Sequence, residues 1–154
     1  MKGVRLCMTV KEKDDLFYVC TLIEFIGRKT NNPRNVIVEA LGEEGIKKQF
    51  MDAGVNHCLS FEQVSDEIIE RYGISQGDFD KITDCKYSIP SVTSIGKLYC
   101  RLVLDCAKSG SELKEMMKIF SSFISDKISD FKTGIYYENL SYLECSYKEG
   151  RLLD

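Results

Sequence analysis

The feature that most constrains the fold is the recurrence of apolar residues at three- and four-residue steps along most of the chain. This spacing places the apolar side chains on one face of an α-helix, and that face must pack against other helices. A first helix is predicted over residues 10–29, because Thr9 and Glu12 have the spacing of a capping box just ahead of an apolar run.

Turn-forming residues divide the rest of the first half into shorter helices. Asn32 and Pro33 predict a helix start, with Asn32 as the cap, and that helix ends at Gly42. A further helix is expected up to about Ala53. Ser60 and Gln63, at capping-box spacing, then begin a helix that closes at Gly73.

The second half is predicted to form a helical hairpin. One helix follows Pro90 and ends at Gly110, and a second, capped by Ser109 and Glu112, continues to Phe131. Between the halves, residues 74–90 have no sustained period and are expected to form an irregular connector. The sequence therefore predicts an all-α fold of about six helices in a single domain, residues 1–154, with sub-bundles 1–73 and 91–131 and a tyrosine-rich C-terminal segment, 132–154.

Charge argues against a nucleic-acid-binding protein. The chain has 154 residues and a net charge of −3, without a basic tail or face. Its most one-sided stretch, residues 60–84, is acidic and includes Asp78, Asp80 and Asp84 in the connector. This stretch is either a solvated surface or a docking surface for a basic partner. The apolar runs are too short to span a bilayer, so no membrane segment is expected.

Cysteine and histidine usage favours a cytoplasmic protein without a metal or cofactor. The seven cysteines are odd in number, follow no signal peptide, and in several cases stand inside apolar runs. His57 is the only histidine, and no cysteine pair has zinc-site spacing. His57 and Cys58 are neighbours, whose side chains point in different directions in a helix or a strand. We therefore predict no catalytic residue, although a cysteine-dependent enzyme remains an alternative interpretation.

Half of the eight tyrosines lie close together in the C-terminal segment, as Tyr136, Tyr137, Tyr142 and Tyr147. Tyrosine has a large apolar body and a polar tip, so it suits both half-buried packing positions and protein interfaces.

Residues 33–53 suggest another function, because two short helices joined by a turn can form a DNA-binding unit. Lys47 and Lys48 would contribute positive charge there, but acidic residues on the same helix oppose phosphate binding.

Several sequence phrases resemble small helical proteins of Firmicutes that have no assigned function, together with longer uncharacterised proteins of the same group. The similarity to the small proteins lies in residues 17–20, 23–25, 36–41, 45, 53–55 and 57. The similarity to the longer proteins lies in residues 63–66, 85–88, 95–97, 122–125 and 136–139. The chain departs from this pattern at Leu140, where the related phrase has proline. Such proteins are associated with loci for an ADP-ribosyltransferase-like toxin, so the resemblance implies an antitoxin or accessory protein that acts by binding.

The leading interpretation is a non-enzymatic protein–protein interaction module with a protein partner, such as a toxin. Its expected contact residues combine the acidic connector and the tyrosine-rich segment: Asp78, Asp80, Asp84, Tyr136, Tyr137, Glu138 and Tyr142. A homodimer is also compatible with the sequence, because Met116 and Met117 could extend an apolar stripe to the surface.

Overall fold

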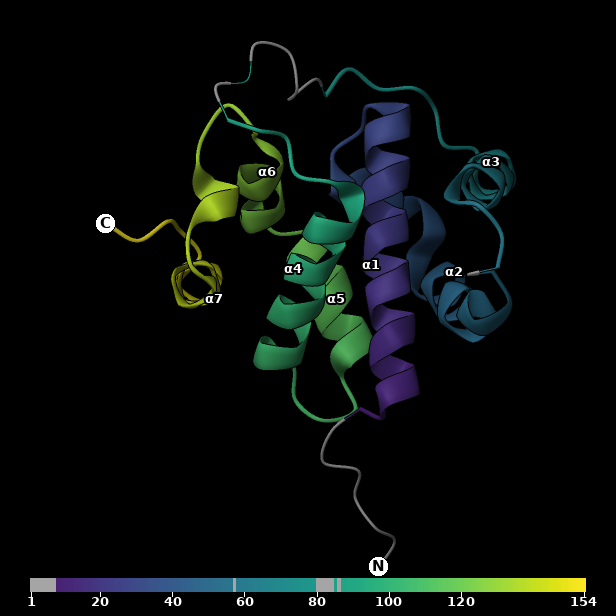
Figure 1. The fold of residues 1–154 in the computed structure, drawn as a ribbon, viewed down its shortest axis with the longest axis horizontal. Coiled ribbons are helices and arrows are strands. Elements are labelled where there is room, and N and C mark those ends of the chain that lie inside the picture. The colour runs from purple at the N-terminus through teal and green to yellow at the C-terminus, as the bar shows by residue number, and fades with distance from the viewer. Residues whose placement is uncertain (1–7, 57, 80–84, 86) are drawn as a thin grey trace, which may run out of the picture.

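The structure, a computed structural model, describes residues 8–56, 58–79, 85 and 87–154 (Figure 1). Over these residues the chain is all-helical, without a β-strand, and forms one compact domain, as the sequence predicts. The helices are α1 (Val10–Thr30), α2 (Arg34–Asn56), α3 (Phe61–Tyr72), α4 (Val92–Cys106), α5 (Glu112–Phe120), α6 (Phe123–Ser129), the 3₁₀ turn η1 (Ile135–Tyr137) and α7 (Leu140–Glu149).

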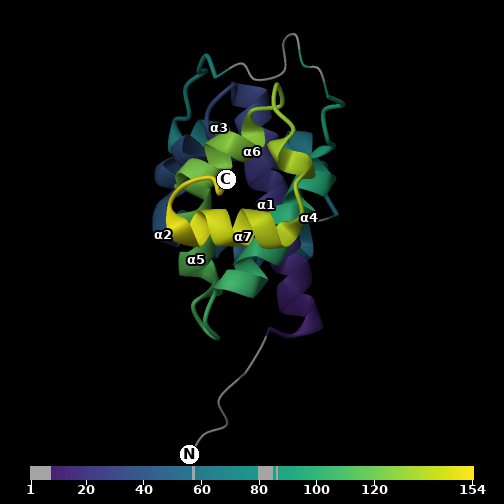
Figure 2. The same ribbon diagram turned by 90° about the vertical axis from the view of Figure 1, so that its left-hand side faces the viewer.

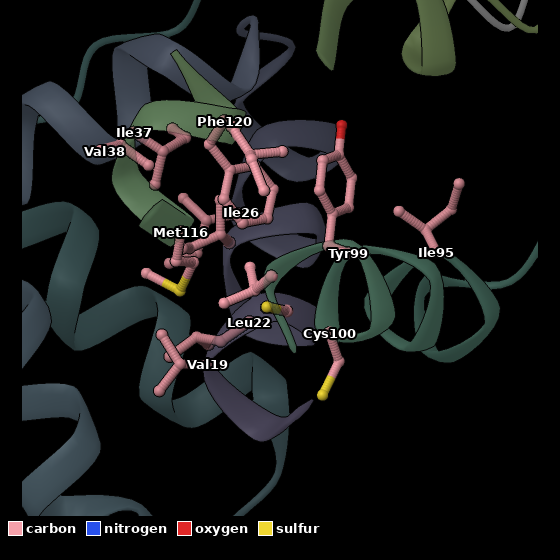
Figure 3. Close-up of a cluster of buried hydrophobic side chains, with 14 of the residues drawn as sticks. Val19, Leu22, Ile26, Ile37, Val38, Ile95, Tyr99, Cys100, Met116 and Phe120 are labelled. Carbon is pink, nitrogen blue, oxygen red and sulfur yellow. The ribbon is translucent and has the colours of Figure 1, made fainter. Parts of the chain in front are cut away.

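Helix α1 lies at the centre of the molecule, between α2 on one side and α4 on the other (Figure 1). Six consecutive residues, Val19–Glu24, are buried, so this part of the helix is covered on every side. The core joins both halves of the chain, from Leu16 in α1 to Leu143 in α7. Figure 3 shows how Leu22 and Ile26 of α1 lie among side chains of α2, α4 and α5.

The predicted capping boxes of α1 and α3 are both confirmed. Thr9 and Glu12 bond each other's backbone at the start of α1, and Ser60 and Gln63 do the same at α3. Gly73 ends α3 in the left-handed conformation, at φ 62°. Between Arg34 and Asn56 the structure has one kinked helix, because Gly42 adopts φ 67° and ψ 177° inside α2. The kink lies at Gly42, where the sequence predicts the end of the helix that starts after Asn32.

Other predicted boundaries are wrong. The single helix expected up to Phe131 is two helices, α5 and α6, that meet at Ser121 and Ser122. The Ser122 hydroxyl donates to the carbonyl oxygen of Ile119 at 2.7 Å, and this local bond competes with helix continuation. Helix α4 ends at Cys106, before Gly110, because Ala107 is extended. Asn32 is used differently from a cap, since its amide nitrogen donates to the carbonyl oxygen of Ser75 at 2.9 Å.

Helix α7 crosses α4 on the outside of the bundle (Figure 2). One tyrosine hydroxyl joins α7 to α5, and another holds the end of the chain against α7. The Tyr147 hydroxyl donates to Glu115 of α5 at 2.6 Å. Burial raises the pKa of Tyr147, and the hydrogen bond to the Glu115 carboxylate raises it further. The Tyr142 hydroxyl donates to the carbonyl oxygen of Leu153 at 2.9 Å. Among the described helices, none has a stretch long and apolar enough to cross a membrane.

Candidate functional site

The predicted contact residues lie in two groups and partly outside the described chain. Asp78 is exposed on the connector, whereas Asp80 and Asp84 lie outside the described residues. Tyr137 and Glu138 are exposed, and Tyr136 is half-buried beside them. Tyr142 is half-buried, and its hydroxyl is bonded within the fold, so it contributes packing at the C-terminal end.

The structure brings the end of the connector onto the tyrosine-rich segment. The Tyr137 hydroxyl donates to the carbonyl oxygen of Ser88 at 2.6 Å. The ring of Tyr87 lies 6.4 Å from that of Tyr137, and Tyr136 meets Tyr137 edge-on at 4.9 Å. Tyr87, Ile89 and Tyr137 are 48%, 42% and 54% exposed, although they are large and apolar. We call these three residues and Tyr136 the tyrosine patch.

A groove of about 380 Å³ opens beside the tyrosine patch. One wall is the face of α4 that carries Ser94, Lys97, Leu98 and Arg101, and the other is formed by Tyr136, Tyr137, Glu138 and Leu140. We call this cavity the α4 groove. Ser94 donates a hydrogen bond to the Tyr136 hydroxyl, which joins the two walls, although burial still raises the pKa of Tyr136.

The described lining residues of the α4 groove have a net positive charge. Lys97 and Arg101 stand one turn apart on α4, both exposed, and neither forms an ion pair with another described residue. Glu138 is the one acid in the lining of this groove. Like charges four residues apart on a helix repel each other, so an acidic group in the groove would be stabilised by both. These two cations do not stand out in the sequence, where they form no basic cluster; only the packing of residues 136–140 beside α4 brings them into a groove.

A buried ion cluster holds the connector end in place. Glu24 of α1 is fully buried, and its carboxylate accepts two hydrogen bonds from the Arg34 guanidinium, each at 2.8 Å. Arg28 donates to the same carboxylate at 2.7 Å and to the carbonyl oxygen of Pro90 at 2.7 Å. Its guanidinium also lies 5.1 Å from the centre of the Phe131 ring. The cluster therefore fixes Pro90, next to Ile89 of the tyrosine patch.

A larger cavity, of about 610 Å³, lies on the other side of α1. Its lining comes from α1, the end of α2, the start of α3 and the start of α4: Lys11, Asp14, Asp15, Phe17, Tyr18, Thr21, Ala53, Gly54, Leu59, Phe61 and Thr93. We call it the α1–α3 pocket. Thr93 and Ser94 are neighbours in the chain, yet one lines this pocket and the other the α4 groove.

The cysteine thiols bear on the alternative interpretation as a cysteine-dependent enzyme, and the lysines of α2 bear on the DNA-binding interpretation. Burial raises the pKa of the Cys20 thiol, and it raises that of Cys100 to about 11. His57 lies outside the described residues, as does Cys7. No group of three metal-ligating side chains occurs among the described residues.

Lys47 stands 3.9 Å from both Glu43 and Glu44, and Lys48 is 2.7 Å from Asp52. The positive charges of residues 33–53 are therefore balanced by neighbouring acids.

Met116 is fully buried between α1 and α2, and Met117 is half-buried (Figure 3). The apolar stripe that suggested a homodimer is thus largely core.

Searches of protein-family models, curated proteins and solved structures find no match to this chain.

Proposed function

We propose that the protein is a non-enzymatic protein-binding module whose contact surface is the tyrosine patch with the adjoining α4 groove. The observation that carries the proposal is the bond from Tyr137 to Ser88. It joins two segments far apart in the sequence, so that exposed apolar side chains from both form one patch. Exposed aromatic clusters of this kind are typical of interface centres.

The charge of the groove specifies the partner further. Lys97 and Arg101 favour a partner segment that brings carboxylates into the groove while an apolar side chain covers the tyrosines. This surface differs from the acidic connector, of which Asp78 is the described member; the connector suits a basic region of the same partner. An ADP-ribosyltransferase-like toxin is the first partner to test, because the sequence phrases resemble proteins from such loci.

The cysteines support a binding role in a reducing compartment, and we place the protein in the cytoplasm. A catalytic thiolate needs a lowered pKa, whereas the pKa values of Cys20, Cys100 and Cys106 are all raised, in each case by burial first. Free thiols throughout the described chain are compatible with that compartment.

The test is affinity purification of the tagged, full-length protein from its native cells at moderate salt. We expect one protein to be recovered in stoichiometric amount, and the double variant K97E/R101E to lose most of it. The matched control is Lys114→Glu, a charge reversal at an exposed position of α5 outside the groove. Equal recovery with K97E/R101E would reject the groove as the contact surface, and recovery of DNA in place of protein would favour a DNA-binding function.

A further inference from the structure

The α1–α3 pocket has the size and lining of a small-molecule site. Its volume of about 610 Å³ lies within the range of ligand pockets, roughly 300–1,000 Å³. Phe17, Tyr18, Ala53, Leu59 and Phe61 make most of its walls apolar. Leu59 remains 46% exposed at the edge, which leaves apolar surface in contact with water.

Aromatic rings form a fixed wall in this pocket. Tyr18 and Phe61 are stacked, with their centres 5.4 Å apart and their planes 20° apart. Phe25 supports Phe61 from behind at 5.6 Å. The Tyr18 hydroxyl is buried without a hydrogen-bond partner, and burial raises its pKa.

The rim of the pocket is acidic. Lys11 reaches from α1 towards the end of α2, where its ammonium nitrogen would lie 3.9 Å from a Cβ added to Gly54. That ammonium is neutralised by Asp15 at 2.9 Å. Asp14 is exposed on the same rim and has no ion-pair partner among the residues that the structure describes. Among the described lining residues, the rim therefore has one negative charge without an ion-pair partner, in the same pocket as the stacked aromatic rings.

We propose that the α1–α3 pocket binds a small aromatic amine, whose rings lie against Tyr18 and Phe61 and whose ammonium group pairs with Asp14. The walls contribute apolar contact, and both the ring faces and the carboxylate favour a cation over a neutral or anionic group. This site is separate from the protein-binding surface proposed above. Figure 1 places α3 and the end of α2 on one side of α1 and η1 and α7 on the other.

The test uses three naphthalene probes that share the ring system and differ in the charge of the group on its methylene: 2-naphthylmethylamine (cationic), 2-naphthylmethanol (neutral) and the carboxylate of 2-naphthaleneacetic acid (anionic). Each is titrated into the full-length protein, with binding followed by amide chemical shifts. We expect the amine to saturate with a dissociation constant below about 1 mM and to shift residues lining the α1–α3 pocket. The alcohol should bind about tenfold more weakly, and the acetate more weakly still, because each loses the ion pair and the cation–π contact.

Two variants locate the charge and the cavity. Asp14→Asn should weaken binding of the amine by up to about fivefold, because the ion pair is lost while the cation–π contact remains. Glu149→Gln, at an exposed acid on α7, should leave the affinity unchanged. Thr93→Phe should block the cavity from an exposed position, so the fold itself is spared. The proposal is overturned if no probe binds, if amine and alcohol bind equally, or if Asp14→Asn leaves the affinity for the amine unchanged.

Discussion

Glu24 has no exposed surface, so its charge has to be balanced inside the fold. Arg34 and Arg28 do so with three hydrogen bonds of 2.7–2.8 Å. Gly27 is part of this arrangement, because a Cβ added there would lie 2.4 Å from Cδ of Arg34. A buried charge of this kind is stable only while its partners are in place. The cluster is therefore sensitive to the loss of any one member.

Glu24→Gln should lower the free energy of unfolding by about 3–5 kcal/mol, because it leaves the Arg34 guanidinium buried without a counter-charge. Urea denaturation followed by circular dichroism measures this loss. The matched control is Glu62→Gln, which removes an exposed partner of Lys29 and should change stability by less than about 1 kcal/mol. Similar effects of the two substitutions would mean that the buried pair does not stabilise the fold.

In the sequence, Glu24 interrupts the apolar stretch from Leu16 to Ile26. A charged residue in the middle of such a run is itself a sign of a buried ion pair, since burial without a partner is too unfavourable. Its partners could not be found in the same way. Arg34 is ten residues away, beyond a turn, and the carbonyl of Pro90 belongs to another part of the chain. Only the packing of α1 against its neighbours brings them together.

At the scale of the elements, close packing of α1 and α4 depends on the absence of a side chain at Gly96. A Cβ added to Gly96 would lie 2.0 Å from Oγ1 of Thr21 and 2.9 Å from its Cα. The second distance involves backbone, so a change of the Thr21 rotamer cannot relieve the overlap. The two helices would have to separate.

Gly96→Ala should therefore destabilise the protein by about 1–3 kcal/mol, despite the higher helix propensity of alanine. Gly54→Ala provides the comparison, because the nearest atom to its added Cβ would be Lys11 Nζ at 3.9 Å. At that exposed position in α2, alanine should stabilise the protein by about 0.5–1 kcal/mol. Thermal unfolding of both variants checks the opposite signs. A Gly96→Ala protein as stable as the parent would contradict the packing argument.

Local sequence predicted the elements best where their ends are set by neighbouring residues. The starts of α1 and α3 follow from capping boxes, in which both partners lie within four positions of each other. The break between α5 and α6 was missed, because Ile119 to Ile128 keep a helical apolar spacing through Ser121 and Ser122. Only part of the tyrosine patch was predicted from the sequence. Tyr136 and Tyr137 were identified from composition, but their contact with residues 87–89 depends on tertiary structure.

At the scale of the whole molecule, the packing of α7 on α4 places two carboxyl groups together. Glu144 of α7 faces Asp105 of α4, with Lys148 as the nearby cation. The hydrogen bond to Asp105 and partial burial raise the pKa of Glu144 to about 7. The folded state consequently holds a proton that the unfolded chain releases near pH 4.5. This contribution to stability is complete below pH 4.5 and is lost as the pH rises through about 7.

Glu144→Gln should remove this part of the pH dependence. At pH 8 the variant should be more stable than the parent by less than about 1 kcal/mol, since Asp105 is exposed and Glu144 is half-buried, so that solvent screens their repulsion. Below pH 4.5 the two proteins should be alike. Urea denaturation between pH 4 and 8 tests the difference, with Glu149→Gln on the exposed side of α7 as the control. A parent protein whose stability rises steadily from pH 5 to 8 in step with the Glu144→Gln variant would contradict the assignment.

The burial of Val19–Glu24, in the middle of α1, has a consequence for biosynthesis. The ribosome makes this helix before α4, which begins at Val92 and covers one of its sides. At about 5–20 residues per second, several seconds pass between the two. During that time the nascent chain exposes an apolar surface that nothing downstream has yet covered. Until α4 has emerged, this apolar surface is open to chaperones or to a partner that binds during translation.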